Sequence, residues 1–135
     1  MNTLVYAVMV LSAICCKQAR NGSATTHENS IENRLAVFVD SCWNQKDMEK
    51  LSSITTQNFT RNLNGIDVVS SELEMQAHMN VFFRAFPDLI LTMDDTFIKD
   101  SVGFTHWEVD GTNTGIFAEA PATGKKIKIS GLRLI

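Results

Sequence analysis

The stretch from Phe104 to Lys126 constrains the fold more than any other part of the chain. Its sequence, FTHWEVDGTNTGIFAEAPATGKK, predicts a strand, a glycine-bounded turn, a second short strand, a loop with proline and glycine, and the start of a third strand. This compact β element carries most of the polar groups that could face a ligand. We therefore expect the pocket of the protein to be built here.

The residues 102–109 form the first strand of this element. Because side chains alternate across a strand, His106 and Glu108 share one face, and Trp107 takes the other. A last amphipathic strand follows Gly124, since Ile127 and Ile129 alternate with lysines, and it runs to the end of the chain.

Helical patterns precede the strands. Apolar residues recur at helical spacing from Ile31 to Trp43 behind a Ser30 cap, and a shorter helix follows over residues 48–54. Ser71 and Glu74 make a capping box for a third helix, which ends at Pro87 and has the apolar stripe Leu73, Ala77, Val81, Phe82, Ala85 and Phe86. Helices followed by antiparallel strands predict one α+β domain, with the helices packed on one face of a curved sheet.

Composition excludes several functional classes. The net charge of −3 and the pI near 5.5 give no electrostatic reason to expect a nucleic-acid partner. The three cysteines show neither a CxxC pair nor a Cys/His cluster with zinc-like spacing, so we expect no disulfide framework and no metal. Cys42 lies on the apolar helical face, which favours a core residue over a nucleophile.

The N-terminus resembles an export signal. The apolar run Leu4 to Ile14 is too short to span a bilayer as a helix, but its length suits a secretory signal in residues 1–16. Small residues before Cys15 and Cys16 resemble a lipoprotein processing site, where one of the two cysteines would carry a lipid tether to the membrane. The alternative is an ordinary N-terminal helix of a cytoplasmic protein. Residues 17–29 are polar and without periodicity, which is typical of a linker before a domain at 30–135.

Several short motifs together resemble the SnoaL-like polyketide cyclase (ester cyclase) family of the nuclear-transport-factor-2-like superfamily. They are Trp43-Asn44, Asn58-Phe59-Thr60-Arg61-Asn62, Phe86-Pro87-Asp88-Leu89, Gly111-Thr112-Asn113-Thr114-Gly115 and Pro121-Ala122-Thr123-Gly124-Lys125, and the resemblance covers about Ile31 to Ile135. It implies a cystatin-like cone, in which a curved mixed β-sheet wraps around N-terminal helices. It also implies an apolar pocket between helix and sheet, a small hydrophobic ligand, and a homodimer formed through the sheet.

The chain departs from the family pattern at three places. Asn62 and Asn113 stand where the family usually carries histidine, and family members normally continue past Ile135 into a strand with the general-base aspartate. We therefore expect a C-terminally truncated SnoaL-like domain. An asparagine can hydrogen-bond a carbonyl group but cannot shuttle protons at neutral pH, so we assign ligand binding to Asn62 and Asn113, together with Trp107.

The family chemistry is cofactor-independent. A base removes a proton next to a carbonyl group of a small apolar compound, and the reaction is an aldol-type cyclisation or an isomerisation. His106 and Glu108 are the candidate base and orienting residue, and a solvated surface pair is the alternative. The functional alternatives are thus a cyclase or isomerase without cofactor, and a noncatalytic exported module that binds a small hydrophobic ligand or dimerises.

Overall fold

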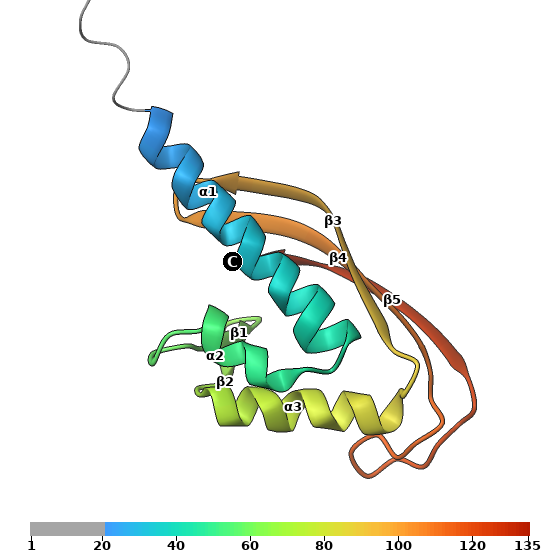
Figure 1. Cartoon of the computed structure of the whole chain (residues 1–135). Coiled ribbons are helices and arrows are strands. Elements are labelled where there is room, and N and C mark those ends of the chain that lie inside the picture. Colours follow the sequence, from blue (N-terminus) through green and yellow to red (C-terminus); the bar gives the residue numbers. More distant parts are fainter. Residues whose placement is uncertain (1–20) are drawn as a thin grey trace, which may run out of the picture.

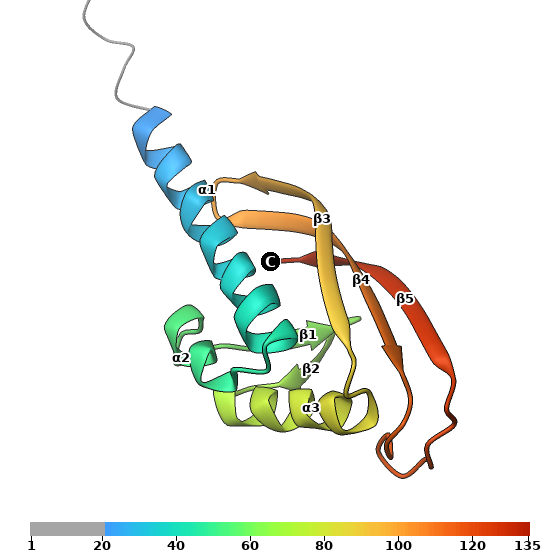
Figure 2. The same cartoon turned by 45° about the vertical axis from the view of Figure 1, so that its right-hand side comes forward.

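The computed structural model describes residues 21–135. The proposed signal peptide and the lipidation site at Cys15 or Cys16 lie outside the described residues. The elements, in chain order, are α1 (Asn21–Ala36), η1 (Val37–Asn44), η2 (Met48–Lys50), α2 (Leu51–Ile54), β1 (Arg61–Leu63), β2 (Ile66–Val69), α3 (Glu72–Ala85), β3 (Ile90–Lys99), β4 (Val102–Thr112) and β5 (Lys126–Leu134). The continuous helix α1–η1 lies along the concave side of the curved sheet β3–β4–β5, and α3 runs across one end (Figures 1 and 2).

The main sheet has the strand order β3–β4–β5, and both of its pairings are antiparallel. The hairpin β1–β2 is a separate two-stranded sheet, also antiparallel. The described strands are therefore antiparallel throughout, whereas the resemblance implied a mixed sheet. The α+β class, with helices on one face of a curved sheet, is confirmed.

Helix α1 begins earlier than the sequence pattern predicted. It already includes Asn21, the first described residue, so residues 21–29, which we expected to be linker, are helical. These residues show no apolar stripe that would predict a helix. They extend a helix whose later turns pack, and adding a turn to an existing helix is far easier than nucleating one.

The segment η1 is a π-helix, in which the backbone N–H of Gln45 donates to the carbonyl oxygen of Asp40 at 3.0 Å. It buries Phe38, Cys42 and Trp43 in the hydrophobic core. Cys42 is completely buried, and burial, followed by the charge of Asp47, raises the pKa of its thiol. The core role predicted for Cys42 is confirmed.

Helix α3 has the predicted cap but a different buried face. Oγ of Ser71 accepts from the N–H of Glu74 at 3.2 Å, and the Glu74 carboxylate accepts from the N–H of Ser70 at 2.6 Å. The predicted stripe is wrong in its first half, because Leu73 is 75% exposed while Met75 and Met79 are completely buried. Two apolar stripes on α3 converge near its C-terminal end, and only the packing against η1 selects between them.

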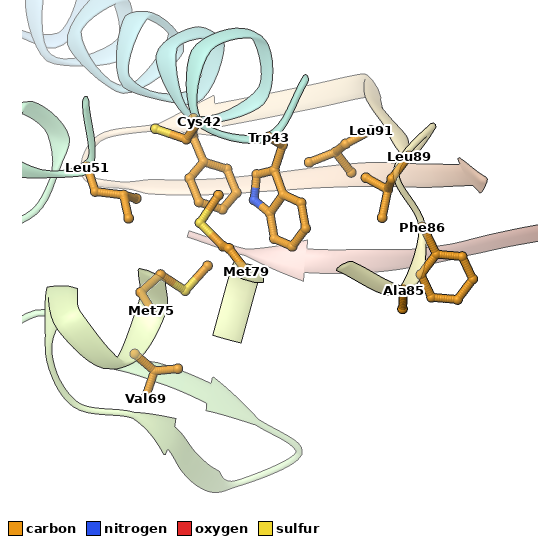
Figure 3. Packing of buried hydrophobic residues seen from close by; sticks show 11 residues of the cluster. Cys42, Trp43, Leu51, Val69, Met75, Met79, Ala85, Phe86, Leu89 and Leu91 are labelled. Atoms are coloured by element: carbon orange, nitrogen blue, oxygen red, sulfur yellow. The ribbon is translucent and has the colours of Figure 1, made fainter. Parts of the chain in front are cut away.

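The core lies between η1, α2, α3 and the beginning of β3 (Figure 3). Trp43 is at its centre, with edge-on ring contacts to Phe38, Phe82 and Phe83 at centroid distances of 5.5 to 6.2 Å.

None of the helices within residues 21–135 is long and apolar enough to cross a membrane.

Candidate functional site

The two faces of the main sheet differ in chemistry. Met93, Trp107, Val109 and Ile127 pack against the core and define the inner face. Along each strand, the residues that alternate with these point away from the helices, and we call that side the outer face.

His106 and Glu108 lie on the outer face. Nδ1 of His106 is 2.9 Å from a carboxylate oxygen of Asp94, and Glu108 pairs with Lys128 at 2.5 Å. Their side chains are 36% and 30% exposed. The shared face predicted from the sequence is observed, but this face is separated from the interior by the sheet itself. The catalytic role of the pair stays a prediction, and the contacts of both residues are those of surface ion pairs.

Asn62 lies in the exposed hairpin β1–β2. Asn64 and Gly65 occupy its tip with φ of 52° and 87°, the two positive values that a tight hairpin turn of this kind needs. The Asn62 side chain accepts from the N–H of Gly65 at 2.8 Å and donates to Asp67 at 3.1 Å. Asn62 therefore holds a turn, and the structure does not bring it to Trp107.

Asn113 is buried and serves as the anchor of the loop that joins β4 to β5. Its side-chain nitrogen donates to the carbonyl oxygens of Ala85 at 3.3 Å and Gly115 at 2.8 Å. Its side-chain oxygen accepts from the N–H and the hydroxyl group of Thr123 at 2.8 and 3.0 Å. Both donors and both acceptor positions of the amide are thus used by the protein, so a ligand would have to displace one of these bonds.

Trp107 is the one predicted ligand-binding residue that lies on the inner face. Its indole is partly buried and lies over Gly131 of β5, where an added Cβ would be 2.6 Å from Cζ2 of the ring. The absence of a side chain at Gly131 therefore creates the space that the Trp107 ring occupies. Its ligand-binding role stays a prediction.

Three basic residues on the inner side, Arg61, His78 and Arg133, were not among the predicted site residues. Nη1 of Arg61 lies 3.2 Å from Nε2 of His78, and the guanidinium of Arg133 lies 4.8 Å from the centre of the Phe38 ring. Arg133 faces buried Thr105 across the β4–β5 ladder, which places it on the inner face. The signal was present in the sequence, because Arg133 is in phase with Ile127 and Ile129 on the final strand.

The three groups share an electrostatic environment that disfavours positive charge. Burial, followed by the charge of Arg61, lowers the pKa of Arg133 to about 10. Burial and then the same arginine lower the pKa of His78, and burial lowers that of Arg61. His78 is therefore neutral at pH 7, and since Arg61 donates to Nε2, its ring proton is on Nδ1.

Trp43 contributes an unused donor to the interior. Its Nε1 is buried and has no hydrogen-bond partner among residues 21–135. In Figure 3 this nitrogen lies on the side of the ring that faces Met79, not on the side of Leu91. Buried polar groups in native proteins are almost always paired, so an orphaned donor calls for an acceptor supplied from elsewhere.

Two hollows border α1. One of about 490 Å³ lies between α1 and α2 and is lined by Asn29, Asn33 and Ser53 among others. The other, about 240 Å³, lies between α1–η1 and β3 and is lined by Leu35, Val39 and Met93 among others. Within residues 21–135, no group of three His, Cys, Asp or Glu side chains is placed to hold a metal ion.

This geometry, a helix lying in the concavity of a curved antiparallel sheet, defines the class of nuclear-transport-factor-2-like α+β proteins. The family model for SnoaL-like polyketide cyclases matches residues 33–135. The chain belongs to that family.

Solved structures share this fold. A putative SnoaL-like polyketide cyclase from Jannaschia sp. CCS1 superposes with a TM-score of 0.69 at 16% identity, covering 87% of this chain and 81% of that one. TsrD from Streptomyces laurentii gives a TM-score of 0.68 at 18% identity, with 78% and 77% covered. IdmH, a putative polyketide cyclase from Streptomyces antibioticus, gives 0.62 at 17% identity, with 76% and 79% covered. No significant match was found among curated proteins.

Proposed function

We propose that this protein binds a small, largely apolar carbonyl compound beside Trp43, where η1, α3 and the inner face of the sheet meet. The observation that carries the proposal is the buried indole N–H of Trp43, which has no acceptor among the described residues. Its surroundings are aromatic, with Phe38, Phe82 and Phe83 in contact with the ring. A carbonyl oxygen on an apolar ligand would pair this donor without bringing a charge into the core. Several solved relatives are described as polyketide cyclases, whose name implies carbonyl-rich compounds.

The test compares two ligands of similar shape. The ketone 2-acetonaphthone carries an acceptor, and 2-ethylnaphthalene does not. Calorimetry should show the ketone binding about tenfold tighter, because one hydrogen bond to a buried donor contributes about 1 kcal/mol or slightly more. Trp43→Phe should abolish this preference, while the matched variant Trp107→Phe should keep it. Equal binding of the two compounds, or an unchanged preference in Trp43→Phe, contradicts the proposal.

A second candidate function is a cofactor-independent cyclase or isomerase, which the state of His78 favours. An unprotonated imidazole on the inner side can take a proton from the carbon next to a carbonyl group; the C–H bonding pair then moves to form the enolate, whose charge rests on oxygen. His78 must first give up its contact with Arg61, since Nε2 is the acceptor of that bond.

Solvent exchange measures this proton abstraction directly. In D₂O, catalytic amounts of the protein should incorporate deuterium into the methyl group of 2-acetonaphthone, followed by NMR. His78→Gln should abolish the incorporation, and His106→Gln on the outer face should not. Ligand binding without deuterium incorporation would be consistent with the binding function and would contradict the enzymatic one.

The homodimer formed through the sheet stays a proposal. It is supported by apolar side chains on the outer face, where Phe104, Leu132 and Leu134 are 41%, 65% and 71% exposed. Leu132→Glu combined with Leu134→Glu should shift the mass measured by light scattering from a dimer to a monomer. A monomeric wild-type protein would contradict the proposal.

A further inference from the structure

Arg133 occupies a position that is unfavourable for an isolated cation. It lies on the inner face of β5 beside an aromatic ring, and no carboxylate among residues 21–135 lies within 4.0 Å of its guanidinium. Its guanidinium lies over the face of Phe38, 4.8 Å from the ring centre. A cation–π contact offsets part of the loss of hydration, but guanidinium groups withdrawn from water are normally paired with an anion.

A second guanidinium makes the arrangement more unfavourable. The C-terminal end of β5, the strand that carries Arg133, lies near β1, the strand that carries Arg61, in both views (Figures 1 and 2), and the charge of Arg61 lowers the pKa of Arg133. The side chain of Arg61 contacts His78, whose pKa is lowered. The two cations therefore repel each other, and the imidazole between α3 and β1 supplies no negative charge. A protein with a net charge of −3 has carboxylates available, yet none within the described residues is placed here.

We propose that Arg61 and Arg133 bind the carboxylate of an otherwise apolar ligand, with Phe38 in contact with its apolar body. The proposal rests on the ligand site proposed above and adds a charge to its occupant. A guanidinium presents parallel N–H donors that match the two oxygens of a carboxylate, and two guanidinium groups together balance its charge. Inorganic phosphate shares the oxyanion chemistry, but it has no apolar part to lie against Phe38.

The experiment uses the full chain at low ionic strength and three probes measured by calorimetry. These are 2-naphthoate, its neutral counterpart 2-acetonaphthone, and inorganic phosphate. Wild-type protein should bind 2-naphthoate at least about tenfold tighter than the ketone, a difference of about 1.4 kcal/mol. Phosphate should bind more weakly than 2-naphthoate, and added salt should reduce the preference for the carboxylate.

Three variants test which arginines produce the preference for 2-naphthoate over the ketone. Arg133→Met and Arg61→Met should each reduce it to about threefold or less, because each keeps the length of the side chain and removes the charge. Arg84→Met is the matched control, since Arg84 is exposed on α3, and it should keep the full preference. Thermal unfolding monitors folding: Arg133→Met should be at least as stable as wild type in the absence of ligand, because an unpaired partly buried charge has been removed.

The outcomes separate this inference from the proposed function. Binding of the ketone with no preference for 2-naphthoate overturns the carboxylate site and leaves the proposed function standing. A preference that survives in both Arg→Met variants also overturns it, as does phosphate binding as tight as 2-naphthoate. Binding of 2-naphthoate that depends on both arginines, with no binding of the ketone, supports the carboxylate site and removes the neutral ligand. Binding of neither organic probe overturns both.

Discussion

Nδ1 of His106 lies 2.9 Å from a carboxylate oxygen of Asp94, directly across the β3–β4 ladder and on the side of the sheet that faces away from the helices. The adjacent Trp107 packs on the opposite face, against the core. The backbone alternation between these two neighbours decides which residue of the strand can meet a ligand in the interior.

The first prediction concerns this outer face. The double variant His106→Ala and Glu108→Ala should bind 2-acetonaphthone within about twofold of wild type, because neither side chain reaches the interior and exposed ion pairs contribute little. Calorimetry measures the affinity. Trp107→Ala is the inner-face control and should weaken binding by about tenfold or more. If the double variant loses binding and Trp107→Ala does not, the assignment of the two faces to their roles is reversed.

The second prediction concerns Asn113, which makes four side-chain hydrogen bonds in a buried loop. Asn113→Ala leaves the carbonyl group of Gly115 and the N–H of Thr123 without their partners. The free energy of unfolding should fall by about 2–4 kcal/mol, measured by urea titration. Asn62→Ala in the exposed hairpin is the control, with an expected loss of about 1 kcal/mol or less. Equal losses in the two variants would show that the loop does not depend on the buried amide.

The third prediction uses two strand glycines that differ in their surroundings. A Cβ at Gly131 would lie 2.6 Å from the Trp107 ring, whereas one at Gly103 would make ordinary contacts of 3.5 Å and longer. Gly131→Ala should therefore displace the indole, lower the free energy of unfolding by about 1–3 kcal/mol and change the tryptophan fluorescence. Gly103→Ala should leave both nearly unchanged. A Gly131→Ala protein with wild-type stability and fluorescence would mean that Trp107 does not occupy this position.

The fourth prediction concerns pH. The pKa of His78 is lowered in the folded protein, first by burial and then by Arg61, so below its ordinary value the unfolded chain binds the proton more readily. The contribution of neutral His78 to stability is thus complete above about pH 6.5 and is lost as the pH falls towards the folded-state pKa. Urea unfolding at pH 7.5 and at lower pH measures this loss. His78→Gln should reduce the pH dependence of the free energy of unfolding. If the pH dependence of the free energy of unfolding is the same in His78→Gln as in wild type, the lowered pKa of His78 is refuted.

Local patterns predicted a large part of the fold. The capping box of Ser71 and Glu74, the shared face of His106 and Glu108, and the core position of Cys42 were all predicted correctly, because each depends on helical or strand periodicity. The patterns failed where the spacing of apolar residues in one segment is compatible with two different buried faces. On α3, both Leu73 and Met75 begin an apolar stripe, and periodicity alone does not choose between them.

The candidate site was predicted less well than the fold. The family motifs drew attention to Asn62 and Asn113, but the hydrogen bonds of both residues hold the chain itself together. The basic residues of the interior come from three distant segments, β1, α3 and β5. Of these, Arg133 alone carried a sequence signal, an arginine in the apolar phase of its strand.

The sequence by itself determined most of the helices and strands, and which of their residues share a face of an element, because these properties follow from the chemistry of neighbouring residues. It did not predict the helix of residues 21–29, and the second short strand expected between β4 and β5 is wrong, since Phe117 and Ala120 form an isolated bridge there. Only the tertiary structure decided which face of β4 points inward, that Arg61 contacts His78 and that Arg133 lies over Phe38. Those relationships depend on how the sheet curves around η1, which brings together residues as far apart in the chain as β1 and β5. The physical reason is that alternation specifies two faces of a strand equally well, and the packing of the whole core selects the one that is buried.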